Sequence, residues 1–223
     1  MRKPGKLIVL DGLDGSGKTT QFALVQESLR RKDIHVKPIS FPDYAEPSSA
    51  LVKMYLRGDF SKDCGEVNAF AASSFYAVDR FASFRRFWQQ DYENGSLILA
   101  SRYVSSNAIH QMPKLPPEEW DAYLDWLSDY EYHKLGLPQP DAILFLDMPP
   151  SVSQSLLTER YGGDESKRDI HEANTDYLAA CREAALYAAR KQHWAVIPCG
   201  SGDKPFSREH IQQEILNHIH EVL

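Results

Sequence analysis

The strongest chemical signal in the sequence is a glycine-rich octapeptide close to its start. Residues 12–19 read Gly-Leu-Asp-Gly-Ser-Gly-Lys-Thr and match the pattern G-x-x-x-x-G-K-[ST] without a gap. In such a loop the glycines let successive backbone N–H groups turn toward one anion, and the start of the next helix reinforces them. Lys18 can reach the β- and γ-phosphates of a nucleoside triphosphate, and the Thr19 hydroxyl can bind Mg²⁺.

The octapeptide therefore predicts a nucleotide-phosphate site, and its surroundings favour this over a strand-to-helix turn without chemistry. An apolar run at 7–10 precedes it and a helical pattern begins near Lys18, as the motif requires. We expect the nucleotide to contact the loop and the residue after it: Gly12, Leu13, Asp14, Gly15, Ser16, Gly17, Lys18, Thr19 and Thr20.

Kinases, GTPases and motor ATPases share this kind of loop, so the loop alone gives a class and no substrate. The chain has no Asn/Thr-Lys-x-Asp sequence of the kind that recognises guanine in GTPases. It also lacks the bulk of an AAA-type module. The sequence therefore favours a small kinase that acts on a nucleotide or a nucleoside.

Short apolar runs that alternate with amphipathic segments must position this loop. Strands are expected at 7–11, 35–40, 97–101, 142–147 and 195–199. Helices are expected near 18–31, 47–57, 64–93, 116–134, 150–160, 173–192 and 206–221. This alternation predicts an α/β, three-layer P-loop NTPase fold, with a five-stranded parallel sheet flanked by helices. Ligands of such sheets bind beyond the carboxyl ends of the strands.

Composition and charge narrow the possible partners. With 223 residues, 43% of them hydrophobic and 25% charged, the chain is expected to form one domain, 1–223, with a short lid at about 160–172. A net charge of −6 argues against nucleic acid or an anionic membrane as the main partner. No apolar stretch is long enough to span a membrane, and three widely spaced cysteines suggest neither a disulfide framework nor a metal knuckle. A cytoplasmic protein is expected.

Segments beyond the loop carry a resemblance to a known family. Residues 11–20 follow an apolar strand, Phe41-Pro42 ends the second strand, and 75–80 read Phe-Tyr-Ala-Val-Asp-Arg. The third strand runs into 101–111, and Gly-Leu-Pro-Gln-Pro-Asp at 136–141 precedes the fourth. In this order the segments resemble the thymidylate kinase family of P-loop nucleoside monophosphate kinases. The resemblance implies a homodimer that phosphorylates thymidine monophosphate (dTMP) to the diphosphate with ATP and Mg²⁺.

The resemblance also implies an acceptor site. It places Asp14 at the deoxyribose 3′-OH and Arg102 at a phosphate, because a cation at the end of a buried strand needs an anionic partner. Tyr76 and Arg80 share a helix face, so the ring can stack on a pyrimidine while the guanidinium donates to a base carbonyl. A packed aromatic and an arginine paired with a nearby carboxylate are the alternative. Further candidates are Phe41 and Pro42 as an apolar wall, and Tyr103, Ser106 and Gln111.

The segment 160–172 is expected to act as the lid. Two glycines give it flexibility, and Arg160, Lys167 and Arg168 give it positive charge for the γ-phosphate. We expect Arg160 to contact ATP and Arg168 to assist transfer. Nearby acidic residues almost balance this charge, so a solvated loop is the alternative.

Two departures from the family pattern keep other functions open. Ser101 stands where the family usually has Asp, so Asp11 or Asp147 would have to help organise the metal through water. Tyr44 stands where many members carry a phosphate-binding arginine. The alternatives are a kinase for another deoxynucleoside monophosphate or a deoxynucleoside, and a nucleotide-binding regulator without catalysis.

Overall fold

A five-stranded parallel sheet forms the centre of the protein. The computed structural model describes residues 4–63, 65–160, 162, 164 and 175–223. The strand order is β2-β3-β1-β4-β5, and every neighbouring pair is parallel. The strands are β1 (Lys6–Gly12), β2 (Val36–Ser40), β3 (Leu97–Ser101), β4 (Ala142–Asp147) and β5 (Ala195–Pro198). This confirms the predicted sheet.

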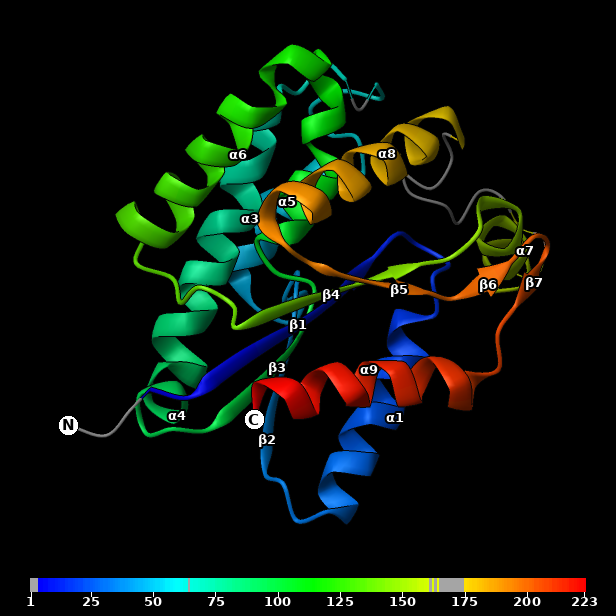
Figure 1. Ribbon diagram of the computed structural model, residues 1–223. Coiled ribbons are helices and arrows are strands. Elements are labelled where there is room, and N and C mark those ends of the chain that lie inside the picture. Colours follow the sequence, from blue (N-terminus) through cyan, green and yellow to red (C-terminus); the bar gives the residue numbers. More distant parts are fainter. Residues whose placement is uncertain (1–3, 64, 161, 163, 165–174) are drawn as a thin grey trace.

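Helices cover both faces of the sheet, as Figure 1 shows. α1 (Lys18–Arg31) and α9 (Arg208–Val222) lie against one face. The other face carries α3 (Ala69–Ser83), α5 (Ser105–His110), α6 (Trp120–Ser128) and α8 (Thr175–Gln192). The remaining α-helices are α2 (Ala50–Leu56), α4 (Gln89–Glu93) and α7 (Pro150–Arg160). The predicted three layers are therefore confirmed.

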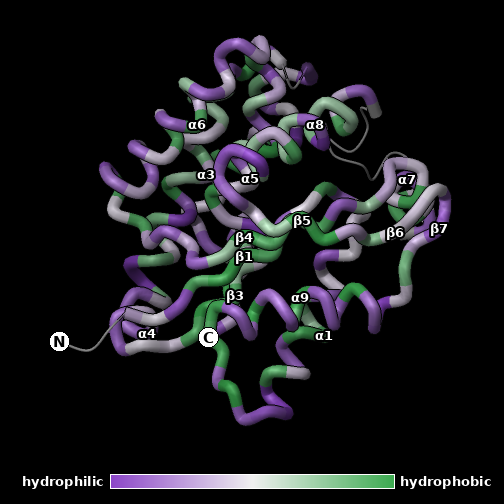
Figure 2. The backbone as a smooth tube through the Cα atoms, in the orientation of Figure 1, coloured by the Kyte–Doolittle hydropathy of each residue, from purple (hydrophilic) through white to green (hydrophobic). Residues whose placement is uncertain are grey.

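The hydrophobic runs account for this layering. Residues 7–12 of β1 are all buried, because β1 lies between β3 and β4 and is covered on both faces. The central strands are accordingly the most hydrophobic part of the backbone in Figure 2, whereas the outer helices alternate between polar and apolar positions. One core cluster joins Leu10 of β1 to Val25 of α1 and Ile215 of α9. Burial on both faces is what a continuous apolar strand requires.

Two π-helical segments extend the regular helices. Phe84–Trp88 joins α3 to α4, and Asp129–Lys134 continues α6. The predicted helix at 64–93 begins only at Ala69, where the Asn68 side chain accepts a hydrogen bond from the Ala71 N–H. The sequence prediction has no counterpart for the six-residue α5 or for a small hairpin of β6 (Gly200–Ser201) and β7 (Lys204–Pro205). Both are too short for a hydrophobic period to appear.

Within the described residues, no helix is both long enough and apolar enough to cross a membrane.

Candidate active site

A cavity of about 860 Å³ opens at the carboxyl ends of the strands. Its lining comes from segments far apart in the sequence: the loop after β1, the end of β2, α3, the end of β3 with α5, and the start of α9. The topology brings these segments together, because all five strands point the same way and end at one edge. One cavity therefore holds most of the polar residues that the sequence singles out.

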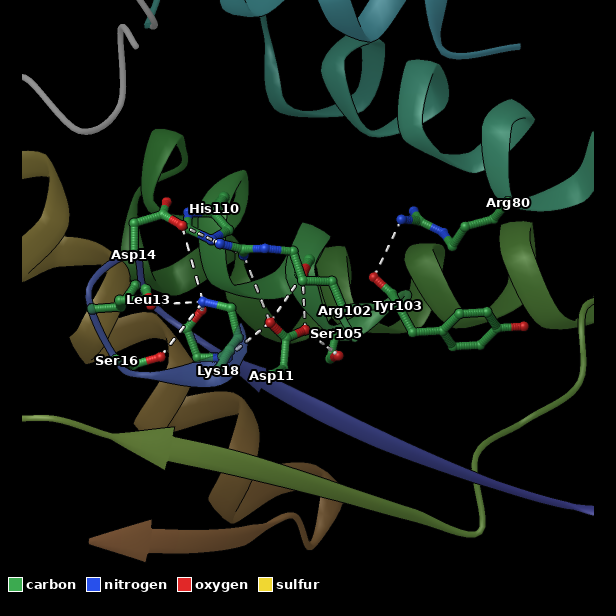
Figure 3. A network of polar contacts seen from close by, with 12 residues as sticks. Asp11, Leu13, Asp14, Ser16, Lys18, Arg80, Arg102, Tyr103, Ser105 and His110 are labelled. Atoms are coloured by element: carbon green, nitrogen blue, oxygen red, sulfur yellow. Dashed lines mark hydrogen bonds and ion pairs between the residues drawn. The ribbon is translucent and has the colours of Figure 1, made fainter. Parts of the chain in front are cut away.

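The glycine-rich loop curls around the end of the Lys18 side chain. Lys18 Nζ donates to the carbonyl oxygens of Gly12 and Leu13, each at 2.7 Å, as Figure 3 shows. Gly15 adopts φ +79°, and a Cβ there would lie 2.4 Å from the carbonyl oxygen of Ser153. Gly15 is therefore required both for its backbone conformation and for its close approach to α7. The ammonium is held inside the loop, at the place where phosphates of a nucleotide would meet it.

Arg102 joins the end of β3 to this loop. Its guanidinium donates to the Asp14 carboxylate and, at 2.9 Å, to His110 Nε2, and it lies 3.7 Å from Asp11 Oδ1 (Figure 3). Burial would lower the pKa of Arg102, but the charges of Asp14 and Asp11 overcome this and raise the pKa above its ordinary value. Arg102 is therefore a permanent cation beside the loop, with Lys18 on the other side of the same carboxylate at 3.9 Å.

Asp11 organises the floor of the site. It is fully buried at the end of β1 and accepts hydrogen bonds from the Gly12 N–H, from Ser105 Oγ at 2.6 Å and from Ser106 Oγ at 2.8 Å. The first turn of α5 is thereby tied to the loop. Ser106 lines the cavity, but its hydroxyl hydrogen is committed to Asp11.

Asp147, the other carboxylate considered for the metal, pairs with Arg182 through two contacts of 2.7 Å. Both carboxylates are thus engaged by side chains of the protein. The described part of the chain has no group of three or more His, Cys, Asp or Glu residues placed to hold a metal ion. Thr19 lines the cavity directly after Lys18, and its role as a metal ligand stays a prediction.

The far end of the cavity is aromatic. Phe41, Pro42, Tyr44 and Tyr76 line it, and the Phe41–Pro42 peptide bond is cis. The Tyr76 ring lies edge-on to Tyr55, with 6.4 Å between ring centroids. These rings give the cavity a wall on which a flat base can stack.

Arg80 lies one helical turn beyond Tyr76 and also lines the cavity, but its guanidinium is buried and forms an ion pair with a carboxylate of the protein. Its Nε and Nη2 donate to the two oxygens of Glu131 at 2.7 and 2.6 Å, and Nη1 donates to the Tyr103 carbonyl at 3.2 Å. The alternative from the sequence, an arginine paired with a carboxylate, is therefore what the structure shows. Contact of the remaining N–H groups of Arg80 with a base stays a prediction.

Comparisons with known proteins agree with this geometry. Residues 10–211 match the model of the family described as "Thymidylate kinase". The chain belongs to the thymidylate kinase family. It is 31% identical over 161 residues to the thymidylate kinase of Caenorhabditis elegans, covering 68% of this chain and 67% of that protein. It is 26% identical over 188 residues to a probable thymidylate kinase of Caldivirga maquilingensis, covering 84% and 82%.

The solved structures show the same fold. A thymidylate kinase from Candida albicans superposes with a TM-score of 0.70 at 20% identity, covering 99% of this chain and 93% of that chain. Together with the family match, this makes the protein a nucleoside monophosphate kinase.

Among the residues predicted for this thymidylate kinase family member, Tyr103 needs a correction. Its side chain is fully buried, donates to the Pro138 carbonyl at 3.1 Å and packs against Trp88 and Phe41. The preceding Arg102 has φ +66°, a left-handed conformation that turns the chain, so the neighbouring side chains diverge. The predicted substrate contact of the Tyr103 side chain is therefore wrong, because the ring belongs to the core.

Gln111 keeps its place as a candidate. It is buried and lines the cavity, and its Oε1 accepts no hydrogen bond from the described residues. The lid predictions cannot be placed in the same way, because Lys167 and Arg168 lie outside the described residues, and Arg160 is described only as the last residue of α7.

Several residues of the site have no signal in the sequence. Glu131 contacts Arg80 and Asn107 of the cavity lining. Phe206, Ser207 and Arg208 bring the start of α9 to the cavity, where Gln21 Nε2 donates to the Arg208 carbonyl oxygen at 3.0 Å. Residue spacing gave no reason to connect them with the loop, since tertiary packing alone brings them there.

Proposed function

We propose that this protein transfers the γ-phosphoryl group of Mg-ATP to dTMP, producing ADP and dTDP. The observation that carries the proposal is the contact of Arg102 with Asp14 of the glycine-rich loop. It brings the cation predicted for an acceptor phosphate next to the loop predicted to hold the donor. The relatives named thymidylate kinase support dTMP as the acceptor.

The transfer needs orientation and charge more than proton removal. An oxygen of the acceptor phosphate, already anionic at neutral pH, attacks the γ-phosphorus, while the bond from that phosphorus to the β-phosphate oxygen breaks and ADP leaves. Lys18 and Arg102 flank the loop and neutralise charge that spreads over the transferred group. Arg160 and Arg168 of the lid are proposed to add to this charge when the lid closes over the nucleotide.

Mg²⁺ fits the residues present. This ion keeps several waters and takes few protein ligands, usually with substrate phosphates, so one hydroxyl at the end of the loop is an adequate anchor. Thr19 would hold it, and Asp11, which accepts from the Ser105 hydroxyl at Oδ2 and from the Ser106 hydroxyl at both oxygens, would act only through water. When bound, the ion would offset negative charge on the phosphates.

The acceptor is proposed to lie between Arg102 and the aromatic wall. Tyr76 would stack on the base, with Phe41 and Pro42 on the wall beside it. Asp14 would accept a hydrogen bond from the 3′-OH, which a carboxylate can do while it accepts from Arg102. Gln111 Oε1 and the outer edge of Arg80 are the remaining polar groups proposed to contact the acceptor.

A homodimer is also proposed. Phe70, Val78 and Phe81 form an apolar stripe on one face of α3 and are 39–41% exposed, and apolar side chains that gather on a surface often mark an interaction site. A second copy of α3 would cover this stripe.

An assay of ADP release across dTMP, dUMP, dCMP, dGMP, dAMP and thymidine tests the proposed function. We expect the highest kcat/KM with dTMP. A higher value with another acceptor would make the protein a kinase for that compound. Binding of ATP without ADP release for any acceptor would indicate a regulator.

A further inference from the structure

Glu131 is a buried carboxylate that the proposed reaction does not use. It lies in the π-helical segment Asp129–Lys134, and its side chain is 0% exposed. A carboxylate out of water is costly unless several donors surround it. π-helical segments are rare and often occur at functional sites.

Three donors from two residues of the cavity wall meet this carboxylate. Arg80 provides Nε at 2.7 Å and Nη2 at 2.6 Å, and Asn107 provides Nδ2 at 2.9 Å. Burial would lower the pKa of Arg80, but the charge and hydrogen bonds of Glu131 raise it above its ordinary value. Glu131 therefore holds Arg80 charged and fixes the plane of its guanidinium.

Glu131 also fixes which atom Asn107 presents. Asn107 Nδ2 lies 2.9 Å from Glu131 Oε1 and 3.2 Å from the Ser73 carbonyl oxygen. Both partners only accept hydrogen bonds, so the NH₂ group, not the amide oxygen, must face them. Because Asn107 lines the cavity, Oδ1 is the atom of the amide that remains for a ligand.

The cavity wall thus carries a donor and an acceptor of fixed identity. Among the described residues, Glu131 and the Tyr103 carbonyl occupy three of the five N–H groups of Arg80, which leaves two for a ligand. A donor beside an acceptor matches the O4 carbonyl and N3–H of thymine or uracil. Cytosine reverses both, with an amino group at C4 and an acceptor at N3.

We propose that Glu131 is a positioning residue that makes the site selective for 4-oxo pyrimidines. It acts through Arg80 and Asn107 and does not touch the base. The inference rests on the proposed function, because it concerns the acceptor base of that same reaction.

The ratio of kcat/KM for dTMP to kcat/KM for dCMP tests the proposal. In Glu131→Gln only one oxygen remains for three donors, and the new NH₂ group faces another donor. Asn107 is then no longer held with Oδ1 toward the ligand, and the ratio is expected to fall by about tenfold or more. Glu131→Asp keeps the charge beside Arg80 but is one methylene shorter, so it should fold and still show a lower ratio.

A matched control is Asp141→Asn, which removes a carboxylate paired with Lys6 at 2.7 Å, away from the cavity lining. It should leave the ratio unchanged. If Glu131 only supports the fold, its variants lose kcat/KM for dTMP and dCMP equally. An unchanged ratio in a variant with native circular dichroism would overturn the proposal.

The wild-type protein provides a test that needs no variant. N3-methyl-dTMP lacks the N3–H donor, so its kcat/KM should lie about tenfold or more below that of dTMP. Equal turnover of the two compounds would overturn the inference and leave the proposed function intact. A wild-type protein without dTMP turnover would refute the proposed function, and the inference with it.

Discussion

At the scale of single residues, the site is a set of charges held by their neighbours. Lys18 contacts two loop carbonyls, Arg102 contacts Asp14, and Arg80 contacts Glu131. The sequence could predict the first two positions because a continuous motif and the end of a strand place them. Glu131 could not be found, because no spacing rule connects it with Arg80, which lies 51 positions earlier in the sequence.

Replacing Lys18 with alanine removes the cation nearest to the predicted phosphate site. We expect kcat to fall by about 100-fold or more, with unchanged circular dichroism, because the charge acts mainly on the transferred group. Initial rates of ADP release measure this. Lys37→Ala, on the exposed side of β2, is the matched control and should retain the wild-type rate. Near-normal turnover of Lys18→Ala would contradict the proposed mechanism.

Replacing Tyr76 with alanine removes the stacking surface of the aromatic wall. Because stacking of a base on an aromatic ring contributes about 1–3 kcal/mol, KM for dTMP should rise by about 5-fold to 150-fold. Tyr76→Phe keeps the ring and should change KM little. If alanine and phenylalanine variants have the same KM, the ring does not contact the base.

At the scale of elements, short segments connect the long ones. Asp11 of β1 binds two serines in the first turn of α5, which fixes this helix against the glycine-rich loop. The long buried strands and amphipathic helices could be predicted from their hydrophobic periods. The six residues of α5 could not, because Ser-Ser-Asn at its start has no apolar pattern and tertiary hydrogen bonds hold it in place.

Tyr103 connects the end of β3 to the segment before β4. Tyr103→Phe removes its hydrogen bond to the Pro138 carbonyl and leaves that acceptor without this donor, so the free energy of unfolding should fall by about 1–3 kcal/mol. Urea denaturation measures the loss. Since the ring is in the core, kcat/KM for dTMP should stay within about twofold of wild type, well under the effect of a lost substrate hydrogen bond. A tenfold fall in kcat/KM in the folded variant would restore Tyr103 to the substrate site.

At the scale of the whole molecule, the parallel sheet gathers the site at one edge, and an apolar stripe on α3 stays 39–41% exposed. The parallel α/β arrangement could be anticipated from the alternation of strands and helices, whereas the strand order came only from the structure. The stripe could not, because Phe70, Val78 and Phe81 read like core positions until the packing shows them exposed.

Phe81→Glu places a charge at the C-terminal end of this stripe. Light scattering should give twice the mass of the chain for the wild type and the mass of one chain for the variant, because a buried unpaired charge opposes association. Leu223→Glu, at the exposed C-terminal end, should remain dimeric. A Phe81→Glu protein that stays a dimer would move the interface elsewhere.

The most direct test of the account follows ATP and dTMP together. Purified protein is mixed with Mg-ATP and dTMP, and anion-exchange chromatography measures all four nucleotides over time. We expect one dTDP to appear for each ATP that is lost, since the acceptor phosphate is the nucleophile. Loss of ATP without dTDP, or no loss of ATP, would contradict the account.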